Sequence, residues 1–410
     1  MLYYLRPLVW VWTPTLLSPL TAMKMHIHPV CCRFAALVLG VLFLTVGFSA
    51  QASDFLLTND DGVPNGVSVF IIAPDGSLTL QGQITLPGYG MSGGYFGLDR
   101  LAVLNSASNQ CIFASEAYTG DIASVAVANG DVVGTFIGSP SDTGVSNGIG
   151  LVANSQYLYA SFTDSSTIGT FQINSGCSLS FVNDVSVGGL QGGIIGGMAV
   201  HGNLLIATYL DGSIESFDIS LGTPVSNGDK QNSTGSKGGA TYPNGIDITQ
   251  DGHFAIFGDT STADVVEVSD ISSGRLTKTA VYRTYAGISS SNILLSPDET
   301  FLFITNTQGD VVSAAHFDVA TGHVTRGCTS NRISNYVDGW SYLGGLALQQ
   351  ITGNGGGVYV TEFGAPSAVS IVNLSVNGST CTLSEATSSP AADPNSLGLL
   401  SLGRFPPRSF

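Results

Sequence analysis

The chain has 410 residues, with 29 acidic and 13 basic side chains and a formal net charge of −16. This excess of negative charge argues against nucleic acid and anionic membrane surfaces as partners. Charged residues make up only 10% of the sequence, glycine occurs 52 times, and short apolar runs are bounded by Gly, Asn, Asp and Ser. Such a composition favours many short strands joined by tight turns over helices.

Residues 1–52 contain basic side chains but no Asp or Glu, and are predicted to be a leader. An apolar run from Phe34 to Phe48 precedes Ala50-Gln51-Ala52, which has the form of a signal-peptide cleavage site. An uncleaved anchor helix is the alternative, although this run is shorter than the roughly 20 residues of a membrane span. We expect residues 53–410, with 10 basic and 29 acidic groups, to be secreted or periplasmic, without membrane insertion.

One strand motif recurs through the chain, and its seven copies predict the fold. The copies are FLLTND at 55, CIFASE at 111, YLYASF at 157, LLIATY at 204, FAIFGD at 254, FLFITN at 301 and VYVTEF at 358. Repeats of about 40–50 residues with several short strands each are typical of four-stranded propeller blades. The sequence therefore predicts an all-β, seven-bladed β-propeller over residues 53–410.

A propeller ring must be closed, because an open blade would leave unpaired strand edges. The first copy begins on a second strand at Phe55, so its innermost strand is missing, while the tail Pro394 to Leu402 aligns with Pro243 to Asp251 of the fifth copy. We therefore predict that the C-terminal strand completes blade 1 as its innermost strand.

Four cysteines remain after the predicted leader, and an even number in an exported chain predicts two disulfides. In blades whose strands run A to D from channel to rim, Cys111 and Cys177 lie at the same end of neighbouring blades, and Cys328 and Cys381 lie in neighbouring outer strands. These two pairs are sterically reasonable, but three pairings are open from the sequence.

Candidate ligand-binding groups gather at the end of the blades that we call the top face, where loops D–A and B–C lie. The ends of the B strands are Asn59, Glu116, Phe162, Tyr209, Asp259, Asn306 and Glu362. The entrances of the A strands include Asn147, Asn244 and Asn395, beside Ser291, Gly196 and Gly344. Polar groups here are also ordinary turn and capping residues.

Carboxylate and amide oxygens around one cavity are the ligand type that Ca²⁺ or Mg²⁺ prefers. We therefore take Asn244, Glu116, Asp259 and Glu362 as candidate metal ligands, and Asn59, Asn147, Asn306 and Asn395 as candidate ligand-binding residues.

No catalytic motif is recognisable. No histidine of the predicted mature chain has a nucleophile on its own face, and GxSxG, HExxH and phosphate-binding glycine loops are absent from the sequence. Arg100 is the exception in top-face positions that otherwise lack basic residues, which argues against a phosphorylated substrate.

The segment SPDETFLFITNTQGDVVSAAHFDVATGHV at 296–324 resembles the lactonase family of seven-bladed propellers, and VYVTEF and FLFITN resemble YVTN-type exported propellers. The resemblance covers residues 53–410 and implies fold more than function. Lactone-hydrolysing members are expected to have His and Arg at strand entrances, where this chain has Tyr242-Pro243-Asn244-Gly245 and Ser289 to Asn292. The Pro-Asn-Gly segment is similar to that of gluconolactonase-like propellers, which implies a metal-ligand role for Asn244.

Two functions follow as hypotheses. The first is a monomeric exported propeller that binds a small molecule, glycan or protein on its top face without catalysis. The alternative is a lactonase-like hydrolase of a small uncharged lactone or ester, assisted by a divalent metal ion.

Overall fold

The computed structural model describes residues 54–91, 100–106, 109–128, 131–136, 149–163, 165–233, 243–259, 265–284, 290–306, 309–333, 342–349, 355–363, 367–394 and 402–405. The chain divides into the units Met1–Ser49 and Ala50–Phe410. The first unit and the predicted leader lie outside the described residues, so the leader stays a prediction. Within the described ranges, no helix has the length and apolar character to cross a membrane.

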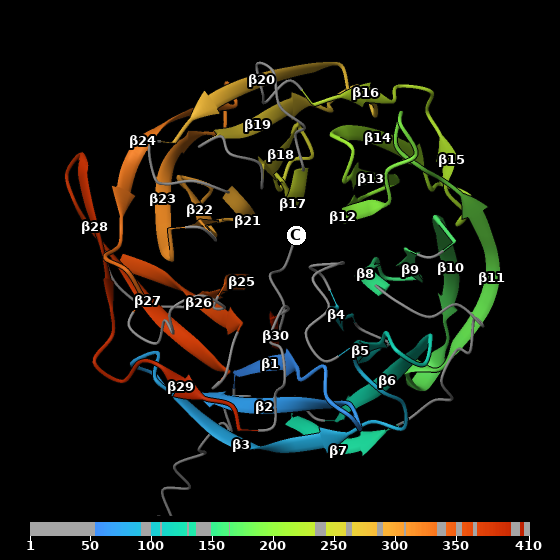
Figure 1. Cartoon of the computed structure of the whole chain (residues 1–410), viewed down its shortest axis with the longest axis horizontal. Helices are drawn as coiled ribbons and strands as arrows, with labels where there is room; N and C mark the ends of the chain where they lie inside the picture. Colours follow the sequence, from blue (N-terminus) through green and yellow to red (C-terminus); the bar gives the residue numbers. More distant parts are fainter. Residues whose placement is uncertain are drawn as a thin grey trace, which may run out of the picture. The chain divides into compact units, whose positions relative to one another are not determined.

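Seven antiparallel sheets are arranged in a ring (Figure 1), which confirms the predicted seven-bladed propeller. Blade 1 contains β1 (Phe55–Asn59), β2 (Gly66–Ile72), β3 (Leu78–Thr85) and β30 (Leu402–Phe405). Blade 2 contains β4 (Leu101–Asn105), β5 (Gln110–Glu116), β6 (Asp121–Ala128) and β7 (Asp131–Phe136). Blade 3 contains β8 (Ile149–Ala153), β9 (Tyr157–Phe162), β10 (Thr167–Ile173) and β11 (Leu179–Ser186), with the short helix η1 (Ser175–Cys177) before β11.

Blade 4 contains β12 (Ile195–His201), β13 (Leu204–Tyr209), β14 (Ser213–Asp218), β15 (Val225–Ser226) and β16 (Gln231–Asn232). Blade 5 contains β17 (Pro243–Ile248), β18 (Phe254–Asp259), β19 (Val265–Asp270) and β20 (Lys278–Arg283). Blade 6 contains β21 (Ser290–Leu295), β22 (Phe301–Asn306), β23 (Val311–Asp318) and β24 (His323–Thr329). Blade 7 contains β25 (Tyr342–Gln349), β26 (Gly355–Phe363), β27 (Ala368–Asn377), β28 (Thr380–Glu385) and β29 (Ala391–Ala392).

The C-terminal strand closes the ring as predicted, but the predicted alignment of the tail is wrong. β30 pairs antiparallel with β1, and Gly403 lies opposite Leu57. The alignment with blade 5 placed the innermost strand six residues earlier, within Pro394 to Leu402. The resemblance of Pro394-Asn395 to Pro243-Asn244 is therefore local, and pairing with β1 fixes the register instead.

The core lies between the blades. Each B strand presents alternate residues to the two neighbouring blades, and the described residues form one apolar cluster in each of the seven seams. In the seam between blades 1 and 2, Leu57 packs with Ile112 and Ala114. On the other side of blade 1, Leu56 and Phe70 pack with Tyr359 of blade 7. Because every blade buries both faces, a side chain on a B strand lies in a seam and not in the channel.

Both preferred disulfides are confirmed. Cys111 of blade 2 is bonded to Cys177 of blade 3, and Cys328 of blade 6 is bonded to Cys381 of blade 7. Each bond therefore ties two neighbouring blades together.

Candidate functional site

The residues at the ends of the B strands are buried in the seams, on the side of the preceding blade. Phe257 packs against blade 4, and Ile304 packs against blade 5. Asp259 and Asn306, two residues further along the same strands, therefore lie on the same faces. Both side chains are almost fully buried. These polar groups are therefore buried between blades.

The prediction that Asn59 belongs to this column is wrong, and Asp60 occupies the position in blade 1. Phe55 pairs with Ile71 in blade 1, and Phe254 pairs with Asp270 at the equivalent place in blade 5. Asp60 therefore corresponds to Asp259, because both follow the equivalent phenylalanine at the same distance along the strand. Asn59 lies on the other face, which is turned towards blade 2. Its Nδ2 donates to the carbonyl oxygen of Ser115 in β5 and to that of Arg100, directly before β4.

Several polar side chains of this column form hydrogen bonds with the next strand outwards. Tyr209 donates to Glu215 Oε2 at 2.9 Å, and Asn306 Nδ2 donates to Ser313 Oγ at 3.0 Å. Glu362 accepts a hydrogen bond from Ser370. The amide of Asn306 and the carboxylate of Glu362 thus have protein partners within their own blades.

The entrances of the A strands in blades 4 to 7 share a register shift, which is the mark of a β-bulge. In blade 5 the shift lies between Pro243 and Ile246, so it includes the buried Asn244. A hydroxyl of the B strand lies at such a bulge in blade 6, where Thr305 Oγ1 accepts from the backbone of Asn292 at 3.0 Å. Asn147 and Asn395 lie outside the described residues, and their predicted roles are untested.

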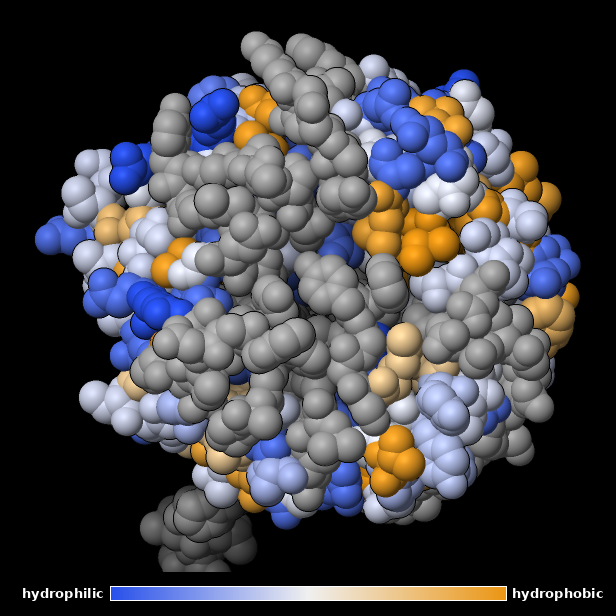
Figure 2. All heavy atoms as spheres, in the orientation of Figure 1, coloured by the Kyte–Doolittle hydropathy of each residue, from blue (hydrophilic) through white to orange (hydrophobic). Residues whose placement is uncertain are grey.

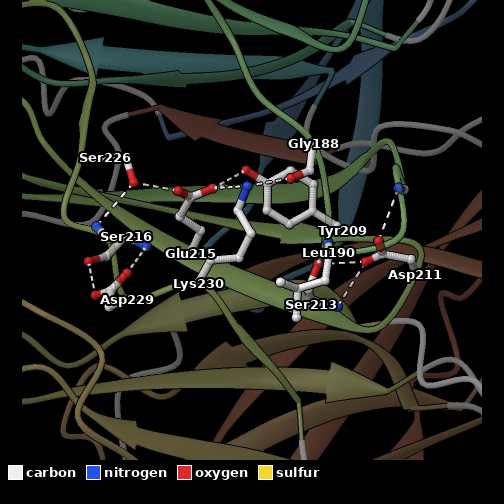
Figure 3. A network of polar contacts seen from close by, with 12 residues as sticks. Gly188, Leu190, Tyr209, Asp211, Ser213, Glu215, Ser216, Ser226, Asp229 and Lys230 are labelled. Atoms are coloured by element: carbon white, nitrogen blue, oxygen red, sulfur yellow. Dashed lines mark hydrogen bonds and ion pairs between the residues drawn. The ribbon is translucent and has the colours of Figure 1, made fainter.

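A network of polar contacts fixes the glycine-rich segment before β12 (Figure 3). Lys230 Nζ lies 3.0 Å from Glu215 Oε2, donates to the carbonyl of Gly188 at 2.6 Å, and lies over the ring of Tyr209. Burial, and then the neighbouring Glu215, raises the pKa of Tyr209, so its hydroxyl stays a proton donor.

The carboxylate of Asp211 holds the same segment. It accepts from the backbone of Gln191 at 2.7 Å and of Gly193 at 3.0 Å, and a Cβ on Gly189 would clash with it. The backbone of the glycine-rich segment therefore binds a carboxylate of the chain itself. Figure 2 shows apolar surface beside the position of β12, and Leu190, 51% exposed, lies just before that strand.

A second polar cluster lies in the seam between blades 1 and 2, and we take it as the candidate functional site. Arg100, directly before β4, donates to Asp61 Oδ2 at 2.5 Å, and both side chains are 1% exposed. Asp61 also accepts from the backbone of Met91 at 2.8 Å. The basic group that the sequence places on the top face is thus neutralised by a buried carboxylate.

Glu116 lies in the same seam, at the end of β5. Its Oε1 accepts from the backbone of Gly88, whereas its buried Oε2 has no hydrogen-bond partner among the described residues. Burial raises the pKa of Glu116 to about 7, with a smaller opposing effect of the Gly88 hydrogen bond. The carboxyl group is therefore divided between its protonated and ionised forms at neutral pH.

Two exposed tyrosines lie beside this carboxyl group. Tyr89 follows Gly88 in the loop between blades 1 and 2 and is 43% exposed, and Tyr118 follows Glu116 by two residues and is 64% exposed. The backbone N–H of Tyr118 donates to the carbonyl of Tyr89 at 3.1 Å, which joins the two loops. Neither tyrosine was predicted as a site residue, because both lie in loops and the candidate residues were the ends and entrances of the strands.

The three acidic candidate metal ligands lie in different blades. Glu116, Asp259 and Glu362 belong to blades 2, 5 and 7. Among the described residues, no group of three or more His, Cys, Asp or Glu side chains has a geometry that would hold a metal ion. A Ca²⁺ or Mg²⁺ site at these residues, and at Asn244, therefore stays a prediction.

The structure is a seven-bladed propeller with polar side chains buried between its blades. Comparison with known proteins identifies its family. Residues 143–405 match the model of the family described as lactonase, 7-bladed beta-propeller. The chain belongs to this lactonase family. A search of curated proteins finds no match.

Several solved structures share the fold. Candidate 6-phosphogluconolactonases from Bacteroides fragilis and Bacteroides uniformis are each 15% identical, with TM-scores of 0.63 and 0.65. The alignments cover 87% and 86% of this chain and 99% and 100% of theirs. A protein of unknown function from Desulfotomaculum acetoxidans is 11% identical, with a TM-score of 0.60 over 86% of this chain and 99% of that one. At these identities the likeness concerns the fold alone.

Proposed function

We propose that this lactonase-family propeller binds a small uncharged molecule, such as a sugar or a sugar lactone, on the top face above the seam between blades 1 and 2. The observation that carries the proposal is the pair of exposed tyrosines, Tyr89 and Tyr118, joined by a backbone hydrogen bond beside Glu116. Tyrosine rings offer an apolar face and a polar edge, so they contact ring-shaped polar ligands at little cost in conformational entropy.

The charges of the site support an uncharged ligand. Arg100 is paired with Asp61, and Lys230, the basic group of the polar network in blade 4, is paired with Glu215. A phosphate group needs cations that are available to it. The substrate in the names of the Bacteroides proteins carries a phosphate. Because both of these cations are already paired, they do not favour the same substrate here.

Ligand binding is tested by isothermal titration with neutral monosaccharides, oligosaccharides and sugar lactones. We expect Y118A and Y89A to weaken binding at least tenfold, whereas Y282A, on the outer strand β20, leaves it unchanged. Equal affinities of Y118A and Y282A for a ligand that the wild type binds would place the site elsewhere. No binding by the wild type across the panel would overturn the proposal.

A second candidate function is hydrolysis of a neutral lactone, and the observation that favours it is the raised pKa of Glu116, about 7. A carboxyl group with this pKa exchanges protons efficiently near neutral pH. The E116Q variant would keep affinity for the lactone and lose hydrolysis by about a hundredfold or more.

E299Q is the matched control. Glu299 is also a buried glutamate that accepts from a backbone N–H of the neighbouring blade, that of Gln250, but it lies at the other end of the strands, away from the top face. Retained hydrolysis in E116Q would exclude this role for Glu116.

A further inference from the structure

The seam between blades 7 and 1, where the ring closes, contains two buried carboxyl groups bridged by the same two hydroxyls. Asp60 follows β1, and Asp393 follows β29. Thr58 Oγ1 lies 2.9 Å from Asp60 Oδ1 and 3.0 Å from Asp393 Oδ2. Ser68 Oγ lies 3.0 Å from Asp60 Oδ2 and 3.2 Å from Asp393 Oδ1.

This arrangement requires more protons than the hydroxyls supply. A hydroxyl donates one hydrogen bond, whereas an ionised carboxylate only accepts. With both carboxylates ionised, Thr58 and Ser68 can satisfy two of their four contacts with the pair. A proton on either aspartate satisfies a third contact, because that carboxyl then donates to a hydroxyl, and it removes one of two like charges in a buried site.

We propose that Asp60 and Asp393 form a proton-dependent latch of the ring: a proton held by the pair stabilises the seam between the last and first blades, and ionisation of both groups loosens it.

The electrostatics of the site agree with this geometry. Burial, and then the nearby Asp393, raises the pKa of Asp60 to about 6, against opposing hydrogen bonds from Gln83, Thr58 and Ser68. An unfolded aspartate titrates near 3.8. Between these values the folded chain binds more protons than the unfolded chain, so this pair makes the fold most stable below about pH 4. The contribution decreases as pH rises to about 6, which is opposite to an ordinary salt-bridged aspartate.

The described residues of the elements around the pair include the following polar and titratable groups. β3 contributes Gln83, whose amide donates to Asp60 Oδ2 at 2.7 Å. β26 contributes Tyr359, whose hydroxyl donates to the carbonyl of Gly76. Glu362 and Glu385 of blade 7 both contact Ser370, which faces blade 6. The charged residue of β30 is Arg404, opposite Leu56, and its side chain lies outside the described residues.

The test uses urea unfolding of the full chain at pH 4.5 and pH 8. We expect D60N to make the change in the unfolding constant between these pH values about thirtyfold smaller than in the wild type, since about 1.5 pH units separate pH 4.5 from the folded pKa of about 6 and each unit is a factor of about 10. D393N makes this change smaller to a lesser extent, because burial alone still raises the pKa of Asp60. At pH 8 both variants would be more stable than the wild type. D211N is the contrasting control: hydrogen bonds lower the pKa of Asp211 despite its partial burial, so D211N would be less stable at pH 8.

The same pH dependence in D393N, D60N and the wild type would overturn the latch, as would equal destabilisation of both variants at pH 4.5 and pH 8. If the variants do not fold, infrared spectra of the E116Q chain decide the question, because E116Q removes a carboxyl group whose pKa, about 7, lies in the same range. A protonated carboxyl band that disappears between pD 5 and pD 8 would support the latch, and its absence at pD 5 would refute it.

Discussion

Removing the last strand tests whether the two ends of the chain form one blade. A chain that stops at Ser401 lacks β30, and β1 becomes an open edge. Four residue pairs join β30 to β1, and about four ladder hydrogen bonds are worth on the order of 4 kcal/mol net. Leu56 and Leu57, which are fully buried, would gain exposure at a further cost of about 3 kcal/mol. This sum is comparable to the whole stability of a domain, about 5–15 kcal/mol.

We therefore expect the truncated chain to lose cooperative unfolding, measured by near-ultraviolet circular dichroism during heating and in guanidinium. A chain that stops at Phe405 keeps β30 and is the matched control, with a transition close to that of the full chain. Coincident transitions for the two truncated chains would refute the closure of the ring by β30.

Three further variants test individual contacts, each by chemical denaturation. R100M leaves Asp61 charged and buried, so we expect a loss of about 3–5 kcal/mol that the double variant R100M/D61N largely restores; no restoration would show that the pair is not the cause. Replacing Cys328 and Cys381 with serine opens a loop of 53 residues at a cost of about 4 kcal/mol, and an unchanged midpoint would contradict this constraint. T305V removes the hydroxyl at the blade 6 bulge and should cost about 1–2 kcal/mol, whereas a smaller loss would show that water replaces this contact.

The seven blades were predictable because the B strand has a strong apolar pattern and a regular spacing. Side chains such as Ile112, Leu205 and Phe303 are buried between blades, and every copy of the motif must meet the same packing requirement. The order of strands in a blade also made the two observed disulfides sterically reasonable, although three pairings were open from the sequence. Features that every blade repeats are therefore the ones that the sequence reveals.

Blade 1 shows why the site was predicted less well. Asn59 and Asp60 are adjacent and both polar, so the sequence offered no reason to prefer one of them as the end of the strand. A slip of one residue reverses the face of a strand. Asn59 faces blade 2 and Asp60 faces blade 7. The pairing of β1 with β2 decides between them, and that information lies in another part of the chain.

The polar partners of the end-of-strand residues were missed for a different reason. Ser68, Glu215, Ser313 and Ser370 stand at alternate positions of C strands and look like ordinary solvent-facing residues in the sequence. In a propeller both faces of such a strand are covered, so these side chains are buried and need partners. Their role depends on packing between blades, which no local pattern contains.

The distribution of these contacts around the ring sets blade 1 apart. The disulfides tie blade 2 to blade 3 and blade 6 to blade 7, so neither crosses a seam of blade 1. Both seams of blade 1 instead contain a carboxyl group whose pKa burial raises, Glu116 on one side and Asp60 on the other. Ionisation of either group as pH rises removes stability from the fold. Because blade 1 is also the blade assembled from both ends of the chain, a rise in pH through about 6 to 7 weakens two seams that neither disulfide crosses, and we expect this part of the molecule to open first.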